Sequence, residues 1–304
     1  MIRDQWNDLI VHNPMLIEVT RFRRRFLSSG TAGSANGVVL VLCLICYATL
    51  VMVVVQNRES ISPIALIMFE TAFLGVLAPM MLYNAIAGER ERRSWDLLLA
   101  APITKSQIVF GKFIGALAGL GVAFLLFQVP IEIAAASYEK AHWQTVLNAD
   151  LVSFTFLMLV CSLTILFSAR VKRGLMALGA TLGSLLSVLV VIPSIVGVGS
   201  ADRHMTDVTF FLHPFIVFQR IYELDDLYFF QSKQLLATKG MSGPTGEFMA
   251  PPTAFQSYVQ PIWWGWPQAL TYLALALVLL GWASNTLNFA ENEVKFLPQG
   301  HKDA

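Results

Sequence analysis

The sequence predicts an all-α integral membrane protein with six transmembrane helices, preceded by an amphipathic interfacial helix. A short charged helix is expected between the second and third transmembrane helices. Of the 304 residues, 56% are hydrophobic and only 13% are charged, and the mean hydropathy is +0.61. Several windows are also apolar over the roughly 20 residues that a helix needs to cross a hydrocarbon core. Together these observations favour a bilayer over water as the solvent.

The predicted organisation follows the alternation of apolar windows and polar segments. Residues 1–37 form a cytoplasmic N-terminus, 38–199 hold five spans and the charged segment 88–112, and 200–267 form an extracytoplasmic region before the sixth span and a cytoplasmic tail over 288–304. The six predicted spans are 38–55, 64–87, 113–136, 151–169, 174–199 and 268–287.

The N-terminal segment has the pattern of a helix that lies on a membrane surface. Asn13 is a capping residue and Pro14 suits the first helical position. Apolar residues then recur at helical spacing at Met15, Val19, Phe22 and Phe26, and arginines flank this stripe. A helix in the inner headgroup layer fits this pattern. An amphipathic helix packed on protein remains the alternative.

The distribution of charge predicts the orientation. If the N-terminus is cytoplasmic, most of the 21 Lys and Arg residues fall on the cytoplasmic side, including Arg170, Lys172 and Arg173 in the short connection between the fourth and fifth spans. The positive-inside rule therefore places both termini and the charged segment in the cytoplasm.

The segment 88–112, GERERRSWDLLLAAPITKSQIVFGK, is the most charged part of the chain. Glu89 and Arg93 have the four-residue spacing that allows pairing on a helix, as do Arg92 and Asp96. Pro102 ends this predicted helix. Thr104 and Gln107 then form a capping box that starts the next helix. Such a segment, joined to membrane helices on both sides, is suited to transmitting force.

The residue patterns of common enzymes and metal sites are absent from the sequence. There is no phosphate-binding Gly-x-x-x-x-Gly-Lys-Ser/Thr loop, so the chain is not expected to bind ATP or to act as an enzyme by itself. The three cysteines, Cys43, Cys46 and Cys161, fall in predicted spans and form neither a disulfide framework nor a zinc site. The net charge of +1 gives no indication of nucleic-acid binding.

Polar side chains inside the predicted spans are candidates for a transport path. Glu70 lies in the second span, and Gln128 and Glu132 lie in the third. Such groups are costly in lipid unless they face a partner or water. For both carboxylates, a place near the outer interface is the simpler alternative. Small-residue spacings at Gly111, Gly115 and Gly119, and at Gly179 and Gly183, predict close helix packing, within the bundle or in a dimer.

The charged segment resembles the hallmark of the permease subunits of ABC type 2 transporters. Members carry an acidic and basic cluster, then Thr and Glu, a leucine run, a proline and a closing Gly-Lys. Ser94 stands here for the usual threonine, and Arg93 occupies a position where many members have glycine. The corresponding residues are Glu89 to Arg93, Ser94, Asp96, Leu97 to Leu99, Pro102 and Gly111-Lys112.

The resemblance implies that residues 94–102 form a coupling helix, which rests in a groove of a separate ATPase subunit. ATP and Mg²⁺ would be bound by that partner, and this chain would bind no cofactor. It also implies that the working exporter contains a second permease copy, identical or paralogous. The chain would be a multi-pass protein surrounded by lipid in the cell (inner) membrane. The implied coupling residues are Glu89, Arg90, Glu91, Arg92, Arg93, Ser94, Trp95, Asp96, Leu97 and Pro102.

Two other functions remain alternatives to an export permease. A permease-like subunit would transmit ATPase-driven motion to an outer partner without transport. A secondary carrier would use an ion gradient, and it would be expected to have paired ionisable groups within the membrane. In the sequence, Glu70 and Glu132 stand isolated from one another.

Overall fold

The computed structural model of the chain describes residues 44–57, 61–91, 103–137, 143–191, 194, 213–219, 221 and 265–295, with side chains in the last range up to Leu287. All regular secondary structure in these ranges is helical. Several predicted features lie outside them: the N-terminal helix, the start of the first span, the residues 92–102 and most of the region 200–267.

The described helices follow one another along the chain in antiparallel fashion. A short apolar helix, Leu44–Gln56, comes first. The remaining elements are α4 (Pro63–Leu82), α5 (Ala87–Glu91), α7 (Lys105–Ser137), α8 (Trp143–Arg170), α9 (Gly174–Leu186) with its continuation η1 (Ser187–Val191), and α13 (Trp266–Lys295).

Five helical segments are long and apolar enough to cross a membrane, so the chain is a multi-pass membrane protein. They contain or overlap the second to sixth predicted spans. Of the first predicted span, only the part from Leu44 onward is described, and it is shorter than a full crossing. The five segments are Pro63–Glu91, Lys105–Ser137, Trp143–Arg170, Gly174–Val191 and Trp266–Leu287.

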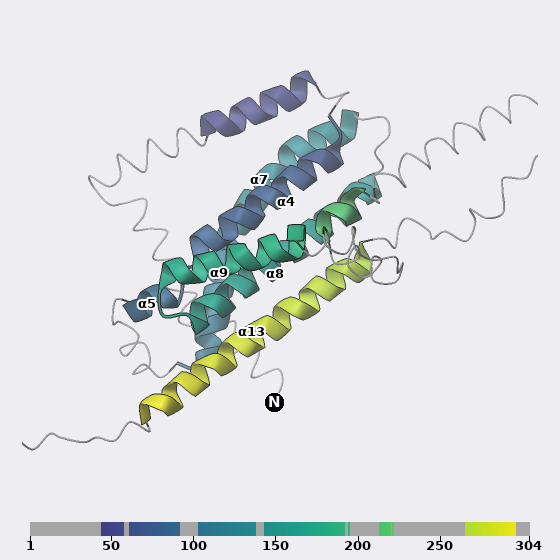
Figure 1. The fold of residues 1–304 in the computed structure, drawn as a ribbon. Helices are drawn as coiled ribbons and strands as arrows, with labels where there is room; N and C mark the ends of the chain where they lie inside the picture. Colours follow the sequence, from purple (N-terminus) through teal and green to yellow (C-terminus); the bar gives the residue numbers. More distant parts are fainter. Residues whose placement is uncertain are drawn as a thin grey trace, which may run out of the picture.

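Helix α8 is the centre of the bundle. It packs most extensively against α13 and next against α4, and Figure 1 shows α4 and α7 on one side of it and α13 on the other. In its most apolar window 67% of the residues are buried, whereas the other four segments reach 39% at most. Its buried hydroxyls at Thr155, Ser162 and Thr164 donate to carbonyls one turn earlier in the same helix. These local bonds allow polar residues to be buried in the middle of the bundle.

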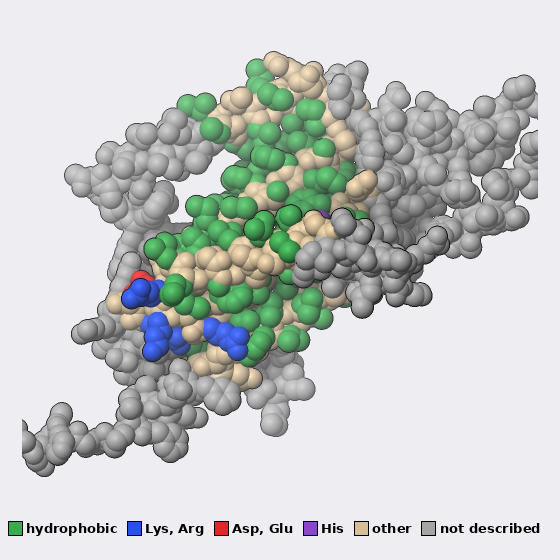
Figure 2. Space-filling view, viewed as in Figure 1, with side chains coloured by type: hydrophobic (Ala, Val, Ile, Leu, Met, Phe, Trp, Pro, Cys, Tyr) green, Lys and Arg blue, Asp and Glu red, His purple; other side chains and the backbone are tan. Residues whose placement is uncertain are grey.

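The outer faces of the other helices are strongly hydrophobic. Leu125 of α7, Leu175 of α9 and Val278 of α13 are 67%, 75% and 65% exposed. In the view of Figure 2, hydrophobic side chains cover the body of the bundle. Basic side chains gather at the end where α5 and the α8–α9 connection lie. In water such a surface would aggregate, whereas lipid chains cover it at no penalty.

Three details of the helix boundaries test the sequence predictions. The capping box is confirmed, because the Thr104 amide donates to Gln107 Oε1 at 2.8 Å and the Gln107 amide donates to Thr104 Oγ1 at 3.3 Å. The predicted start of the fourth span at residue 151 is too late, since α8 begins at Trp143. The second span is not one continuous helix to residue 87, because α4 ends at Leu82 and a turn precedes α5.

Within the described part of this chain, the predicted small-residue packing is seen for one of the two glycine series. Gly111 is buried, and a Cβ at Gly119 would lie 3.9 Å from Met81 Cε of α4. By contrast, Gly179 and Gly183 face open space, since a Cβ added at either would meet no atom of the described residues within 4 Å. The spacing in α9 therefore does not bring two described helices of this chain together.

Candidate functional site

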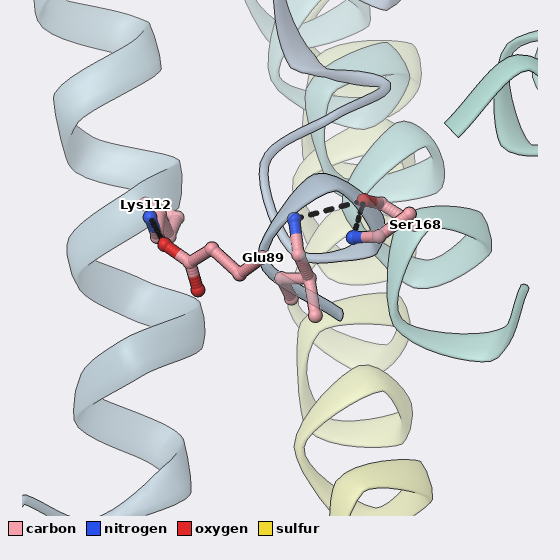
Figure 3. A network of polar contacts seen from close by, with 5 residues as sticks. Glu89, Lys112 and Ser168 are labelled. Carbon is pink, nitrogen blue, oxygen red and sulfur yellow. Dashed lines mark hydrogen bonds and ion pairs between the residues drawn. The ribbon is translucent and has the colours of Figure 1, made fainter. Parts of the chain in front are cut away.

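The turn between α4 and α5 is held by one serine of α8. The Ser168 hydroxyl donates to the carbonyl oxygen of Tyr83 at 2.9 Å and accepts from the backbone amides of Ile86 and Ala87, each at 3.0 Å. Figure 3 shows the two amides converging on this oxygen. A hydroxyl has one donor and two acceptor positions, and all three are used here. Ser168 is fully buried, so it fixes the point at which the chain leaves the membrane helix α4.

Three successive residues after this turn bind three different helices. Glu89 forms an ion pair with Lys112 of α7, which Figure 3 shows bridging the two elements. Arg90 Nη1 donates to the carbonyl oxygen of Ala169 in α8 at 2.7 Å. Glu91 Oε1 accepts from the backbone amide of Gly174, the first residue of α9, at 2.8 Å. Helix α5 is therefore tied to α7, α8 and α9 at once.

The signs of these charges match the ends of the helices that they contact. A helix carries a partial positive charge at its N-terminus and a partial negative charge at its C-terminus. Arg90 is placed at the last carbonyls of α8, and Glu91 is placed at the first amide of α9. Each contact also satisfies a backbone group that has no partner inside its own helix. Exchanging the two charges would oppose both dipoles.

The same end of the bundle has two links to α13. The Arg170 guanidinium lies 4.4 Å from the ring centroid of Trp282, in a cation–π contact. The Ser106 and Ser284 hydroxyls are 2.9 Å apart and hydrogen-bonded, which joins the start of α7 to α13. The contacts of α5 and these two links together connect α7, α8, α9 and α13 at one end.

Beside the Glu91 contact, the α4–α5 turn packs closely against the backbone of Gly174 at the start of α9. A Cβ placed on Gly174 would be 1.8 Å from Asn84 Oδ1, 3.0 Å from Asn84 Cγ and 3.2 Å from Tyr83 Cδ2. With a Cβ at residue 174, the Asn84 side chain would have to leave its position between the α4–α5 turn and the start of α9. Nothing in the local sequence signals this requirement, because Gly174 is simply the first residue of a predicted span.

We expect Gly174→Ala to lower the free energy of unfolding by about 1–3 kcal/mol, the usual penalty for overpacking. Gly179→Ala in the same helix is the matched control, because its added methyl group meets open space; it should be neutral or slightly stabilising, by up to about 1 kcal/mol of helix propensity. Thermal unfolding of the purified variants measures both. Adding Asn84→Ala to Gly174→Ala should recover part of the loss, and equal unfolding midpoints for the two glycine variants would contradict the packing argument.

The predicted coupling residues are only partly within the described chain. Glu89, Arg90 and Glu91 are brought together with α7, α8 and α9, whereas the other seven, from Arg92 to Pro102, lie outside the described residues. The predicted partner of Glu89 at helical spacing, Arg93, lies outside the described residues, and within them Glu89 pairs with Lys112. Ser168 was missed, since a single serine in a span carries no sequence signal of its tertiary contacts.

The predicted transport-path residues lie in the half of the bundle away from α5. Glu70 of α4 is fully buried, and Gln128 of α7 is partly buried with its Nε2 atom inaccessible. Glu132 of α7 is exposed. The structure adds Asp150 of α8, which is 8% exposed and faces Gln128. Sequence reasoning missed Asp150 because it placed the start of the span one residue after it.

The fold and this end of the bundle define a class: a multi-pass helical membrane protein whose charged connection at one end is fixed to several helices. The family model for ABC-2 family transporter proteins matches residues 31–290 of the chain. The chain therefore belongs to the ABC-2 transporter family, and it is the membrane component of an ABC transporter, as its resemblance to the type 2 permeases predicted. No curated protein sequence matches it significantly.

Proposed function

We propose that the chain is the permease subunit of an ATP-driven exporter, which forms the substrate pathway and takes its motion from a separate ATPase subunit through the segment 88–112. The observation that supports coupling is the set of contacts made by Glu89, Arg90 and Glu91 with α7, α8 and α9. Because these residues directly precede the segment 92–102, a displacement of that segment would act on three membrane helices together.

In this proposal the ATPase subunit supplies the nucleotide site. ATP and Mg²⁺ bind there, and closure of two ATPase subunits pushes the coupling segments of two permease copies, either identical or paralogous. The hydrophobic outer faces of α4, α7, α9 and α13 are suited to lipid and to contact with the second copy. The substrate pathway would lie between the two copies.

The distribution of basic residues supports a cytoplasmic location for this end, and hence for both termini. Every Lys and Arg side chain that the structure describes lies at the α5 end of the bundle, as the positive-inside rule expects of a cytoplasmic face in the cell (inner) membrane. These residues are Arg90, Lys105, Lys112, Arg170, Lys172 and Arg173.

A single crosslinking experiment tests the partner, the coupling segment and the orientation. A photo-crosslinking amino acid is placed at Ser94, or at Ser242 as the matched control, and the native membranes are irradiated. We expect the Ser94 variant to capture a protein whose peptides contain the Gly-x-x-x-x-Gly-Lys-Ser/Thr loop, and the Ser242 variant not to capture it. The proposal fails if no nucleotide-binding protein is captured at Ser94, or if it is captured only at Ser242.

A further inference from the structure

Three polar side chains from three helices have buried atoms without a hydrogen-bond partner in the half of the bundle away from α5. Both carboxylate oxygens of Glu70 in α4 lack a donor, and so does Oδ1 of Asp150 in α8. The Nε2 atom of Gln128 in α7 lacks an acceptor. Glu70 is 0% exposed and Asp150 is 8% exposed, so bulk water does not reach these oxygens in this conformation.

Helices α4 and α8 are neighbours at this level, since the Thr71 hydroxyl donates to Ser153 Oγ at 2.7 Å. The charges of Glu70 and Asp150, which lie beside this contact along their helices, repel each other. Asp150 in turn interacts electrostatically with Glu132, the exposed carboxylate of α7, and faces the amide of Gln128. The structure thus brings Glu70, which stood isolated in the sequence analysis, near an acidic residue that the sequence analysis did not consider. It does so because α8 begins at Trp143 and therefore includes Asp150.

Among the described residues, the helices around this pair bring no Lys or Arg to it, and His213, at the start of the segment 213–219, has its Nε2 atom 2.8 Å from the carbonyl oxygen of Leu189. Helix α9, and α13 as far as Leu287, contain no Asp, Glu, Lys, Arg or His. The remaining titratable side chain of these two helices is Tyr272 of α13, which packs on Phe156 of α8. On α4, α7 and α8, the charged groups in the membrane half away from α5 are Glu70, Glu132 and Asp150 themselves.

Two ionised carboxylates in this position would be strongly unfavourable. Burying one unpaired charge costs several kcal/mol or more, and a second like charge beside it adds to this. A metal ion is not indicated, because among the described residues no group of three or more His, Cys, Asp or Glu could hold one. A proton needs no cavity, neutralises one charge, and supplies an O–H donor to an oxygen that lacks one.

We propose that Glu70 and Asp150 form a buried proton-binding site between α4 and α8, which exchanges protons with the membrane surface away from α5 through Glu132. A proton from water passes to Glu132 and then to the pair, so only O–H bonds are made and broken. Separation of α4 from α8 during a transport cycle would hydrate the carboxylates and release the proton. The site goes beyond the proposed function, since its existence does not depend on the ATPase subunit.

A hydrophobic carbodiimide tests this site in the full chain, purified in lipid. The reagent adds to a carboxylic acid only in its protonated form, so it reports a buried, protonated carboxyl group. We expect an adduct on the peptide carrying Glu70 or Asp150, with a yield that decreases as the pH is raised. Glu70→Gln should remove the adduct at that position. A water-soluble carbodiimide should leave both residues unmodified, and Lys172→Gln, which changes an exposed charge at the opposite end, should not change the pattern.

The Asp150→Asn variant provides the sharper measurement. Removing the neighbouring negative charge should move the pH of half-maximal labelling of Glu70 to a lower value, because repulsion no longer favours the protonated acid. The proposal is overturned if neither residue forms an adduct at any pH at which the chain stays folded. It is also overturned if Asp150→Asn leaves the pH of half-maximal labelling of Glu70 unchanged. If either variant fails to fold, infrared spectroscopy is applied to the chain without substitutions. A band of a protonated carboxyl group that disappears at high pH supports the proposed site, and the absence of such a band refutes it.

Discussion

Replacing Ser168 with alanine should lower the free energy of unfolding by about 2–4 kcal/mol, because each buried backbone group left without a partner costs about 1–3 kcal/mol. The substitution removes the donor to the Tyr83 carbonyl and the acceptor of the Ile86 and Ala87 amides, all at a fully buried position. Since these bonds hold the α4–α5 turn, stimulation of the ATPase by the permease should fall as well. Thermal unfolding and ATPase assays of the reconstituted complex measure the two effects.

Ser162→Ala is the matched control for this prediction. Ser162 lies in the same helix and is equally buried, but its hydroxyl donates to Met158 within that helix. Its removal leaves a carbonyl that still belongs to the backbone ladder, so stability should change little. If the two alanine variants unfold at the same temperature, the three-way contact of Ser168 does not stabilise the turn.

Charge reversal at Glu89 should uncouple ATP hydrolysis from transport. Glu89→Lys places two positive charges side by side where the structure has the ion pair with Lys112. A contact that links two sites typically carries about 1–3 kcal/mol of coupling free energy, or roughly 5–150-fold in the measured response. We therefore expect about a tenfold loss of transport per ATP hydrolysed. Some stability should be lost as well, because the two side chains are only 23% and 26% exposed, so the unfolding temperature of each variant is measured alongside transport.

The exchanged pair provides the internal control. Glu89→Lys combined with Lys112→Glu restores opposite charges across the same two elements, so it should recover much of the coupling that either single variant loses. Lys172→Glu changes an exposed basic residue at the same end of the bundle and should have little effect. Transport in liposomes containing both subunits gives the measurement. Failure of the double variant to improve on Glu89→Lys would show that this ion pair does not carry the coupling.

The sequence predicted features that depend on neighbouring residues. The reciprocal bonds of Thr104 and Gln107 were foreseeable because a capping box is complete within four residues. The tight connection at residues 171–173 was foreseeable from two apolar windows separated by a few basic residues. Both are local patterns, in which the partners of an interaction are fixed by their spacing along the chain.

Errors arose where apolar windows alone set the boundaries. The predicted fourth span began only at residue 151, because Asp150 and its neighbours lower the local mean hydropathy. The helix itself extends outward to Trp143. As a result Asp150 was left out of the candidate transport path, and Glu70 was judged to be isolated. The glycines of α9 show that such spacing allows a close contact without naming the neighbour, since no described helix of this chain packs on them.

The amino-acid sequence by itself determined that this chain is a helical membrane protein of the ABC-2 type, with a charged connection after its second apolar window, because hydropathy, charge and motif are properties of contiguous residues. Only the tertiary structure decided that Glu89, Arg90 and Glu91 reach three different helices, that Ser168 holds the preceding turn, and that Glu70 and Asp150 are buried on neighbouring helices. These contacts join residues far apart in the chain. They depend on which helices are neighbours and which faces they turn to each other, and that follows from the packing of the whole bundle.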